Sequence, residues 1–230
     1  MSFLFSNSGV EFVILLFVRL LIIFTILPVH EYAHGYAARK LGDNTALIAG
    51  RLTLNPLAHI DPVGAVLLLL FGFGWAKPVP INPRHFKNYR RDTAITAFAG
   101  PLSNFICSLV AVFAARILYN IEAVFFKDSY SILLILIGLA IEYFALINLS
   151  LAIFNLIPVE PLDGSRILSY FLPSKANAFI AQYAFYIRIA LMVLVFGGLL
   201  ATPLSWLINK VFDLFYAAFF WVDLLFRAVF

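Results

Sequence analysis

Long apolar runs separated by short polar stretches dominate the chain, and their lengths predict membrane-spanning helices. A helix needs about 20 residues to cross the ~30 Å hydrocarbon core of a bilayer. Four runs reach this length: residues 12–40, 93–115, 131–154 and 176–200. A further helix is predicted from residue 203 onward, and its scattered charges leave open whether it spans the membrane or lies at its interface.

The segment between the first two of these helices has a different character. Residues 45–55, TALIAGRLTLN, alternate and contain β-branched side chains, which predicts a short β-hairpin or strands there. The apolar stretch 65–73 is too short to span and is expected to be re-entrant or buried. Residues 75–92 are rich in proline and basic residues, so no regular helix is expected there. The predicted fold class is an all-α polytopic membrane protein with about five to six transmembrane helices, a small membrane-associated β-hairpin and a re-entrant segment.

The composition excludes an ordinary soluble domain. Hydrophobic residues make up 63% of the chain and charged residues 12%, about half of the ~25% typical of soluble domains. A soluble protein of 230 residues could not bury that much apolar surface. The net charge of +4 is better explained by cytoplasmic loops than by nucleic-acid binding. Cys107 is the single cysteine, so no intrachain disulfide can form, and no removable signal peptide is expected.

The distribution of basic residues predicts the orientation in the membrane. They concentrate between the first two helices: Arg39, Lys40, Arg51, Lys77, Arg84, Lys87, Arg90 and Arg91. This segment is therefore expected on the cytoplasmic side. If residues 65–73 do not cross, helix 12–40 and helix 131–154 both end at that side. His30 and His34 near the first end and Asp163 beyond the second are then expected at one depth.

The stretch HEYAH, residues 30–34, carries a candidate metal site. Residues i and i+4 of a helix share one face, so His30 and His34 can bind one Zn²⁺. Glu31 lies about 100° around the helix from His30, near the metal but not facing it. That position suits a general base acting on water. Ionisable residues inside membrane segments are usually functional, which favours this interpretation over two satisfied polar residues at a helix end.

A catalytic zinc usually has three protein ligands and one open position. Position 40 is lysine, where one class of soluble zinc proteases would require a third histidine. The remaining candidates for the third ligand are Asp43, His59, Asp61, His85 and Asp163. Asp163 is favoured because topology places it at the depth of the histidines, and Gly164 beside it permits a tight turn.

These motifs resemble a known family. HEYAHG at 30–35 together with NLIPVEPLDG at 155–164 resembles the site-2 protease family of intramembrane zinc metalloproteases, in its compact prokaryotic branch without PDZ or CBS domains. AGPLSN at 99–104 resembles the motif on the intervening helix. The likeness covers roughly residues 10–172. We therefore expect a single integral-membrane protease domain over 1–230, with a catalytic core at about 10–172 and C-terminal helices at about 175–230.

The resemblance implies one Zn²⁺ per chain, bound by His30, His34 and Asp163. It also implies that Glu31 is the catalytic base. Asn155 matches a polar residue that contacts the substrate backbone or the developing oxyanion.

Several polar residues also have simpler interpretations. Asn155 could serve only as a helix C-cap. Pro101 and Asn104 match the intervening-helix motif, with a substrate-related or structural role, and Asn104 could simply form a hydrogen bond between helices. Glu142 and Arg188 could pair with each other inside the membrane or reach an aqueous cavity.

The predicted function is hydrolysis of a peptide bond within or near a transmembrane helix of another protein. The expected partners are that substrate and the lipid bilayer, with a homo-oligomer left open and no nucleic acid. The expected location is the cell membrane, multi-pass, with the active site towards the cytoplasmic side. An extended substrate could pair with the strand-like segment 46–54. The alternatives are a membrane metal transporter or metal-binding protein, and an inactive protease-like scaffold. Four histidines are too few for a di-iron hydroxylase.

Overall fold

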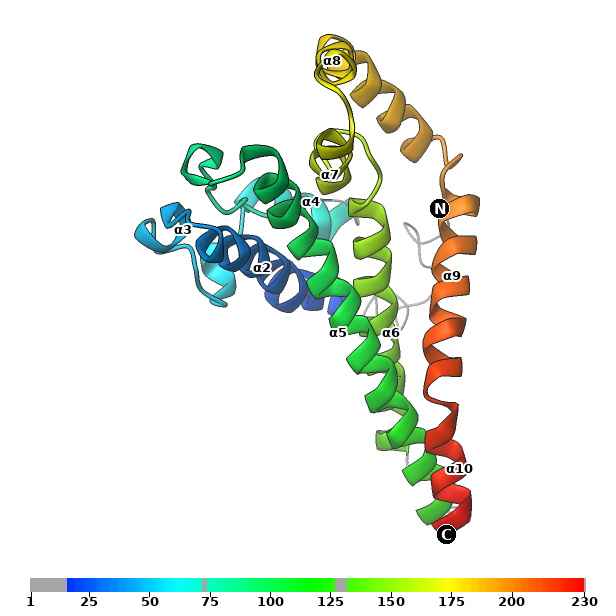
Figure 1. The fold of residues 1–230 in the computed structure, drawn as a ribbon. Coiled ribbons are helices and arrows are strands. Elements are labelled where there is room, and N and C mark those ends of the chain that lie inside the picture. Colours follow the sequence, from blue (N-terminus) through cyan, green and yellow to red (C-terminus); the bar gives the residue numbers. More distant parts are fainter. Residues whose placement is uncertain (1–15, 72–73, 127–131, 230) are drawn as a thin grey trace.

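The structure is a computed structural model that describes residues 16–71, 74–126 and 132–229 (Figure 1). Within these residues, four helices are long and apolar enough to cross a membrane: Leu16–Lys40, Tyr89–Phe125, Leu133–Asn155 and Ser174–Phe196. The protein is thus an all-helical, multi-pass membrane protein. The sequence expectation of five to six such helices was too high for the described part of the chain. The helix from residue 203 becomes α9 (Ala201–Ala218) and α10 (Phe220–Val229), and neither is among the four.

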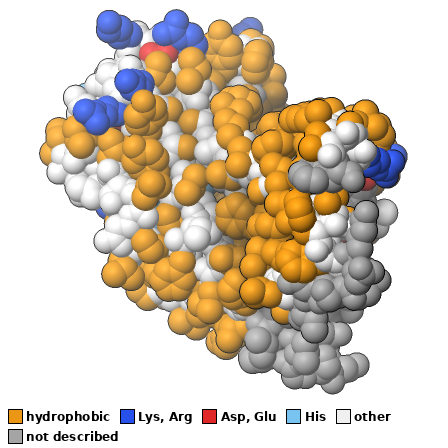
Figure 2. All heavy atoms as spheres, turned by 90° about the horizontal axis from the view of Figure 1, so that it is seen from below, with side chains coloured by type: hydrophobic (Ala, Val, Ile, Leu, Met, Phe, Trp, Pro, Cys, Tyr) orange, Lys and Arg blue, Asp and Glu red, His pale blue; other side chains and the backbone are white. Residues whose placement is uncertain are grey.

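Helix α5 (Tyr89–Phe125) is the central helix, with 37 residues and a length of about 55 Å. Helix α6 (Ile132–Asn155) returns along it, and α9 packs beside both. Helices α2 (Leu27–Lys40) and α7 (Asp163–Phe171) pack on α5, and α10 contacts it as well (Figure 1). Helix α5 begins at Tyr89, so the sequence misassigned residues 89–92 as irregular. Figure 2 shows side chains that are mostly hydrophobic over the face seen from below.

The helix that contains Pro28 is loosened, as the sequence predicts. The segment η2 (Ile22–Ile26) is a π-helix, and the backbone N–H of Leu27 donates to the carbonyl of Ile22, five residues earlier. Pro28 is buried and has no N–H for the carbonyl of Phe24. The wider turn before the proline absorbs this missing bond without ending the helix.

The β-hairpin predicted for residues 45–55 does not form. Residues Thr45–Ile48 make a short helix, α3, and Gly50 at φ +66° closes the following turn. The carboxylate of Asp43 accepts from the backbone N–H of Thr45 at 3.0 Å, which starts a helical turn in place of a strand. No strand occurs in the described residues. An isolated antiparallel bridge joins Ile60 and Ala76.

The short apolar stretch forms helix α4 (Pro62–Phe71). Its ten residues extend about 15 Å, half of the bilayer core, so it cannot span the membrane. Arg19 donates to the carbonyls of Leu69 and Leu70 at the last turn of α4. A cation at this end satisfies carbonyls that have no partner within the helix. Residues 72 and 73, the end of the apolar stretch 65–73, lie outside the described residues.

The hypothesis that Glu142 pairs with Arg188 is wrong. Glu142 on α6 accepts from the hydroxyl of Tyr119 at 2.9 Å and from the hydroxyl of Tyr216 on α9. Arg188 lies on α8 (Ser174–Phe196) and donates to a carbonyl of its own helix. Two phenols satisfy the glutamate, which ties α9 to the α5–α6 pair.

A second polar contact fixes α10 against the same end of α5. The guanidinium of Arg116 binds both carboxylate oxygens of Asp223, and Asn120 donates to that carboxylate at 2.8 Å. Arg116 and Asp223 are both mostly buried, with side-chain exposures of 12% and 22%. A bidentate pair of this kind satisfies two charges that would otherwise be costly in an apolar environment.

Asp43 connects the end of α2 to the proline-rich strap, which we define as residues 75–86. Its buried carboxylate accepts from the backbone N–H of Asn82 at 2.7 Å and pairs with Nδ1 of His85 at 2.8 Å. Burial alone would raise the pKa of Asp43, but hydrogen bonds from Thr45, His85 and Asn82 outweigh it and hold that pKa below its usual range. The strap is thereby held in place over α2.

Replacing Asp43 with Asn should lower the free energy of unfolding by about 1–3 kcal/mol at pH 7, because buried partners lose a charged acceptor. The folded pKa of Asp43 is lower than the unfolded value, so its contribution is present above about pH 4 and is lost as pH falls through the folded pKa. Thermal unfolding in detergent at pH 7 and at pH 3 measures this. The exposed Asp213→Asn is the control, and equal stability of Asp43→Asn and wild type at pH 7 would contradict the prediction.

Candidate metal centre

Two imidazoles and one carboxylate converge where α2, α5 and α7 meet. His30 and His34 lie one turn apart on α2, and both are buried. Asp163 is the first residue of α7. The Nε2 atoms of His30 and His34 are 3.0 Å apart, and each is 3.3 Å from Oδ2 of Asp163. These three residues form a group that could hold a metal ion, with ligand atoms supplied by segments 129 residues apart (163 minus 34).

The three ligand atoms fit a zinc ion. Zinc binds imidazole nitrogen and carboxylate oxygen at about 2.0–2.2 Å in tetrahedral geometry, which puts neighbouring ligand atoms about 3.3 Å apart. The observed separations of 3.0 and 3.3 Å match this spacing. Burial would raise the pKa of the Asp163 carboxyl, but the two adjacent imidazoles outweigh it and hold that pKa well below its usual range. Asp163 is therefore ionised, as a zinc ligand must be.

The backbone of α5 orients His34. Nδ1 of His34 lies 2.7 Å from the carbonyl oxygen of Thr96. Since a carbonyl only accepts, Nδ1 must carry the proton and donate it, which leaves the lone pair of a neutral imidazole on Nε2. A hydrogen bond at the second nitrogen is the usual way to fix a metal-binding histidine. Nδ1 of His30 is buried with no hydrogen-bond partner among the described residues, so the orientation of His30 depends on packing.

Gly100 makes the close approach of α5 to both histidines possible. A Cβ at this position would lie 2.4 Å from Nε2 of His34 and 2.6 Å from Cε1 of His30. No larger residue fits without displacing the imidazoles. The sequence motif AGPLSN contains Gly100, but sequence reasoning singled out its proline and asparagine and missed the glycine.

Asp163 is held at the site by the packing of α7. A Cβ at Gly164 would lie 2.3 Å from the carbonyl oxygen of Leu156, so the start of α7 contacts the chain just beyond α6. At the other end of α7, Arg90 of α5 donates to the carbonyls of Ser169 and Leu172, and Asn177 of α8 donates to that of Ser169 at 2.9 Å. Both ends of the helix that presents Asp163 are thus fixed to neighbouring segments.

Glu31 faces the strap. Its Oε2 accepts from the backbone N–H of Val79 at 2.8 Å, and Glu31 is partly buried. A carboxylate has two oxygens, and this bond engages one of them. The neighbouring carbonyls of Lys77 and Pro78 accept from Arg51 at 2.7 and 3.3 Å, which fixes the strap at this point. Sequence reasoning missed Val79, because a backbone donor leaves no signature in residue type.

The other candidates for the third ligand are engaged elsewhere. Asp43 and His85 bind each other. Nε2 of His59 lies 2.8 Å from the carbonyl of Thr53, and Asp61 accepts from the backbone N–H of Gly64 at the start of α4. These residues hold turns, as polar side chains in turn segments commonly do.

The remaining motif residues lie on the helices around the site. Asn155 is the last residue of α6, and its amide donates to the carbonyl of Leu151 at 3.0 Å. Pro101 and Asn104 are buried on α5. Both polar atoms of the Asn104 side chain are buried without a hydrogen-bond partner in the described part of the chain, so the helix-to-helix bond considered from the sequence is not present there.

Comparison with known proteins gives a consistent result. The model of "Peptidase family M50" matches residues 135–195. Relatives named "Putative zinc metalloprotease" include YwhC of Bacillus subtilis and Rip2 of two mycobacteria. YwhC is 38% identical over 82% of this chain and 84% of its own length. Rip2 of Mycolicibacterium smegmatis is 24% identical over 73% of this chain and 63% of its own length, and Rip2 of Mycobacterium tuberculosis H37Rv is 26% identical over 82% and 69%. No solved structure matches.

Replacing Gly100 with Ala should weaken zinc binding at least tenfold, because the added methyl group occupies the space of the two imidazoles. Zinc content of the purified protein after dialysis against a chelator series measures the change. Gly35→Ala is the matched control beside His34, since its Cβ would meet side-chain atoms of Leu52, Val79 and Ala46 at 3.2 Å or more and no imidazole atom. Equal zinc retention in both variants would show that the approach of α5 does not shape the site.

Proposed function

Because the chain belongs to peptidase family M50, the site-2 protease family of zinc metalloproteases, we propose that it cleaves transmembrane helices of other membrane proteins at the centre formed by His30, His34 and Asp163. The convergence of these ligands beside Glu31 within a multi-pass membrane protein carries the proposal. The helices α2 and α5 that border the centre belong to candidate membrane spans, so a substrate that reaches them must come from the bilayer or its surface.

Metal binding and proton transfer are assigned to different residues of the chain. His30, His34 and Asp163 would hold the zinc ion, which supplies a Lewis acid and makes water acidic enough to attack at neutral pH. Glu31 takes the proton of the attacking water and passes it to the leaving amine. The hydrogen bond from Val79 restrains one carboxylate oxygen of Glu31, so the other is the one available for this transfer.

The remaining motif residues, Asn155, Pro101 and Asn104, have separate proposed roles. Asn155, at the end of α6 and eight residues before Asp163, would contact the substrate backbone or the developing oxyanion. Pro101 has no backbone N–H, so the helical hydrogen bond to the carbonyl of Ala97 is missing, one turn before Pro101 and close to Gly100. Asn104 of the same helix is buried and has no hydrogen-bond partner among the described residues, and it would bind water that reaches the centre.

The orientation in the cell membrane follows from charge. The centre lies between the C-terminal half of the span Leu16–Lys40 and the N-terminal part of α5, and these segments border the basic loop of residues 39–91. Basic loops face the cytoplasm, which would place the centre towards the cytoplasmic side of the cell membrane. Water is available at that depth, whereas the peptide bonds of an intact substrate helix are hidden by internal hydrogen bonds.

Replacing Glu31 with Gln should reduce cleavage of a reconstituted transmembrane substrate at least a hundredfold, because the amide cannot take a proton from water. The zinc content should stay at about one per chain. His34→Ala and Asp163→Ala should lose both zinc and cleavage. Zinc quantification beside gel-based cleavage measures the two effects. Full cleavage by Glu31→Gln would exclude the proposed mechanism.

Replacing Val79 with Pro should lower kcat about tenfold with little change in KM or zinc content, since proline removes the N–H that restrains Glu31. Val79→Ala keeps the N–H and is the matched control for loss of the buried side chain. If the alanine variant loses as much kcat as the proline variant, packing of the strap and not the hydrogen bond is responsible.

A further inference from the structure

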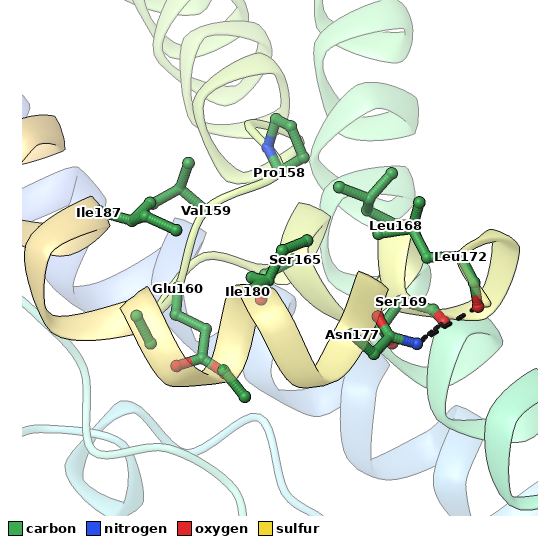
Figure 3. A pocket seen from close by; sticks show the side chains of 12 residues that line it. Pro158, Val159, Glu160, Ser165, Leu168, Ser169, Leu172, Asn177, Ile180 and Ile187 are labelled. Atoms are coloured by element: carbon green, nitrogen blue, oxygen red, sulfur yellow. Dashed lines mark hydrogen bonds between the residues drawn. The ribbon is translucent and has the colours of Figure 1, made fainter. Parts of the chain in front are cut away.

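A pocket of about 220 Å³ opens between the segment that leads to Asp163, helix α7 and helix α8 (Figure 3). It is smaller than the about 300–1,000 Å³ typical of small-molecule sites, so it suits one side chain better than a whole ligand. Most of its lining is aliphatic: Pro158, Val159, Leu168, Leu172, Ile180, Ala181, Ala184 and Ile187. None of the residues of α8 is buried, so this helix forms an outer wall of the pocket.

Glu160 is the one charged residue that lines this pocket. It is exposed, and no ion pair of the described residues includes it. The other polar residues of the lining are already bonded to backbone carbonyls: Ser165 to Leu162, Ser169 to Arg166, and Asn177 to Ser169. Glu160 is therefore the charged group that a bound side chain would meet.

We propose that this pocket is a specificity subsite for a lysine or arginine side chain of the substrate, an inference that rests on the proposed protease function. The aliphatic walls match the methylene stem of such a side chain, and Glu160 matches its charged end. Transmembrane helices carry an excess of Lys and Arg at their cytoplasmic ends. A substrate cut near that face thus presents the chemistry that the pocket fits.

The position of Glu160 in the chain limits where the basic residue lies in the substrate. Glu160 lies three positions before the ligand Asp163, which corresponds to at most about 11 Å of extended chain. An extended substrate advances about 3.3 Å per residue. The residue that occupies the pocket is therefore within about three positions of the cleaved bond.

The test uses purified full-length protein and one transmembrane peptide in which each of the three positions on either side of the cleaved bond is Lys, Leu or Glu. Wild type should cleave the Lys peptide about fivefold better in kcat/KM than the Leu peptide at one position, the size expected of one solvent-accessible ion pair. Glu160→Gln should bring that ratio to about one, and Glu160→Lys should invert it in favour of Glu. Asp213→Asn, which removes an exposed carboxylate on α9, should keep the wild-type ratio.

A binding measurement provides a readout independent of turnover. In the Glu31→Gln background, the Lys peptide should bind about fivefold more tightly than the Leu peptide, and adding Glu160→Gln should remove the difference. Ala184→Trp, which fills the pocket, should also remove it. An unchanged Lys-to-Leu ratio in Glu160→Gln, with cleavage intact, overturns the subsite. Absence of zinc-dependent cleavage of every peptide by wild type would instead overturn the protease proposal itself.

Discussion

The approach of two imidazoles and one carboxylate to within 3.3 Å of one another is the constraint on which the rest of the structure depends. Two imidazoles and one carboxylate at these separations match the ligand set of a single zinc ion. The cation compensates for burying polar groups at membrane depth. The surrounding helices then have to approach closely enough to hold the ligands, and Gly100 and Gly164 provide the two tight contacts that permit this.

Backbone groups do most of the orienting at this centre. The carbonyl of Thr96 sets the tautomer of His34, and the N–H of Val79 restrains Glu31. Arg90 fixes the last turn of the helix that begins with Asp163. Backbone groups on regular, packed segments move little, so they place catalytic side chains with a precision that flexible side-chain partners would not give. The strap supplies one such group because Asp43 holds it against the end of α2.

Helix α5 is long enough to contribute to two separate regions, the metal centre and the contacts with the C-terminal helices. Its first half borders the metal centre, and its last turns carry Arg116, which binds Asp223 of α10. Nearby, Glu142 joins α6 to Tyr216 of α9. These charged contacts lie some 16 residues, or about 24 Å, beyond Gly100 along the helix. They anchor the C-terminal helices far from the site, while α8, which has no buried residue, stays lightly held beside the pocket.

The sequence by itself determined the features that depend on neighbouring residues. The lengths of the apolar runs predicted the long helices, the i, i+4 spacing put His30 and His34 on one face, and a proline predicted the loosened turn at 22–26. Topology and charge went one step further and favoured Asp163 over four other candidates, because they fix the depth at which each helix ends. Along the chain, this information is local or follows from counting membrane crossings.

Only the tertiary structure decided the features that join distant segments. The bonds of His34 to Thr96 and of Glu31 to Val79 span 62 and 48 residues, and neither backbone partner is marked by its residue type. The alternation at 45–55 predicted strands, but a strand needs a partner, and the buried carboxylate of Asp43 instead starts a helical turn there. Periodicity records which side of a segment is apolar. Which groups meet across the molecule depends on the packing of whole helices, and that energy is shared by many contacts that no single stretch of sequence contains.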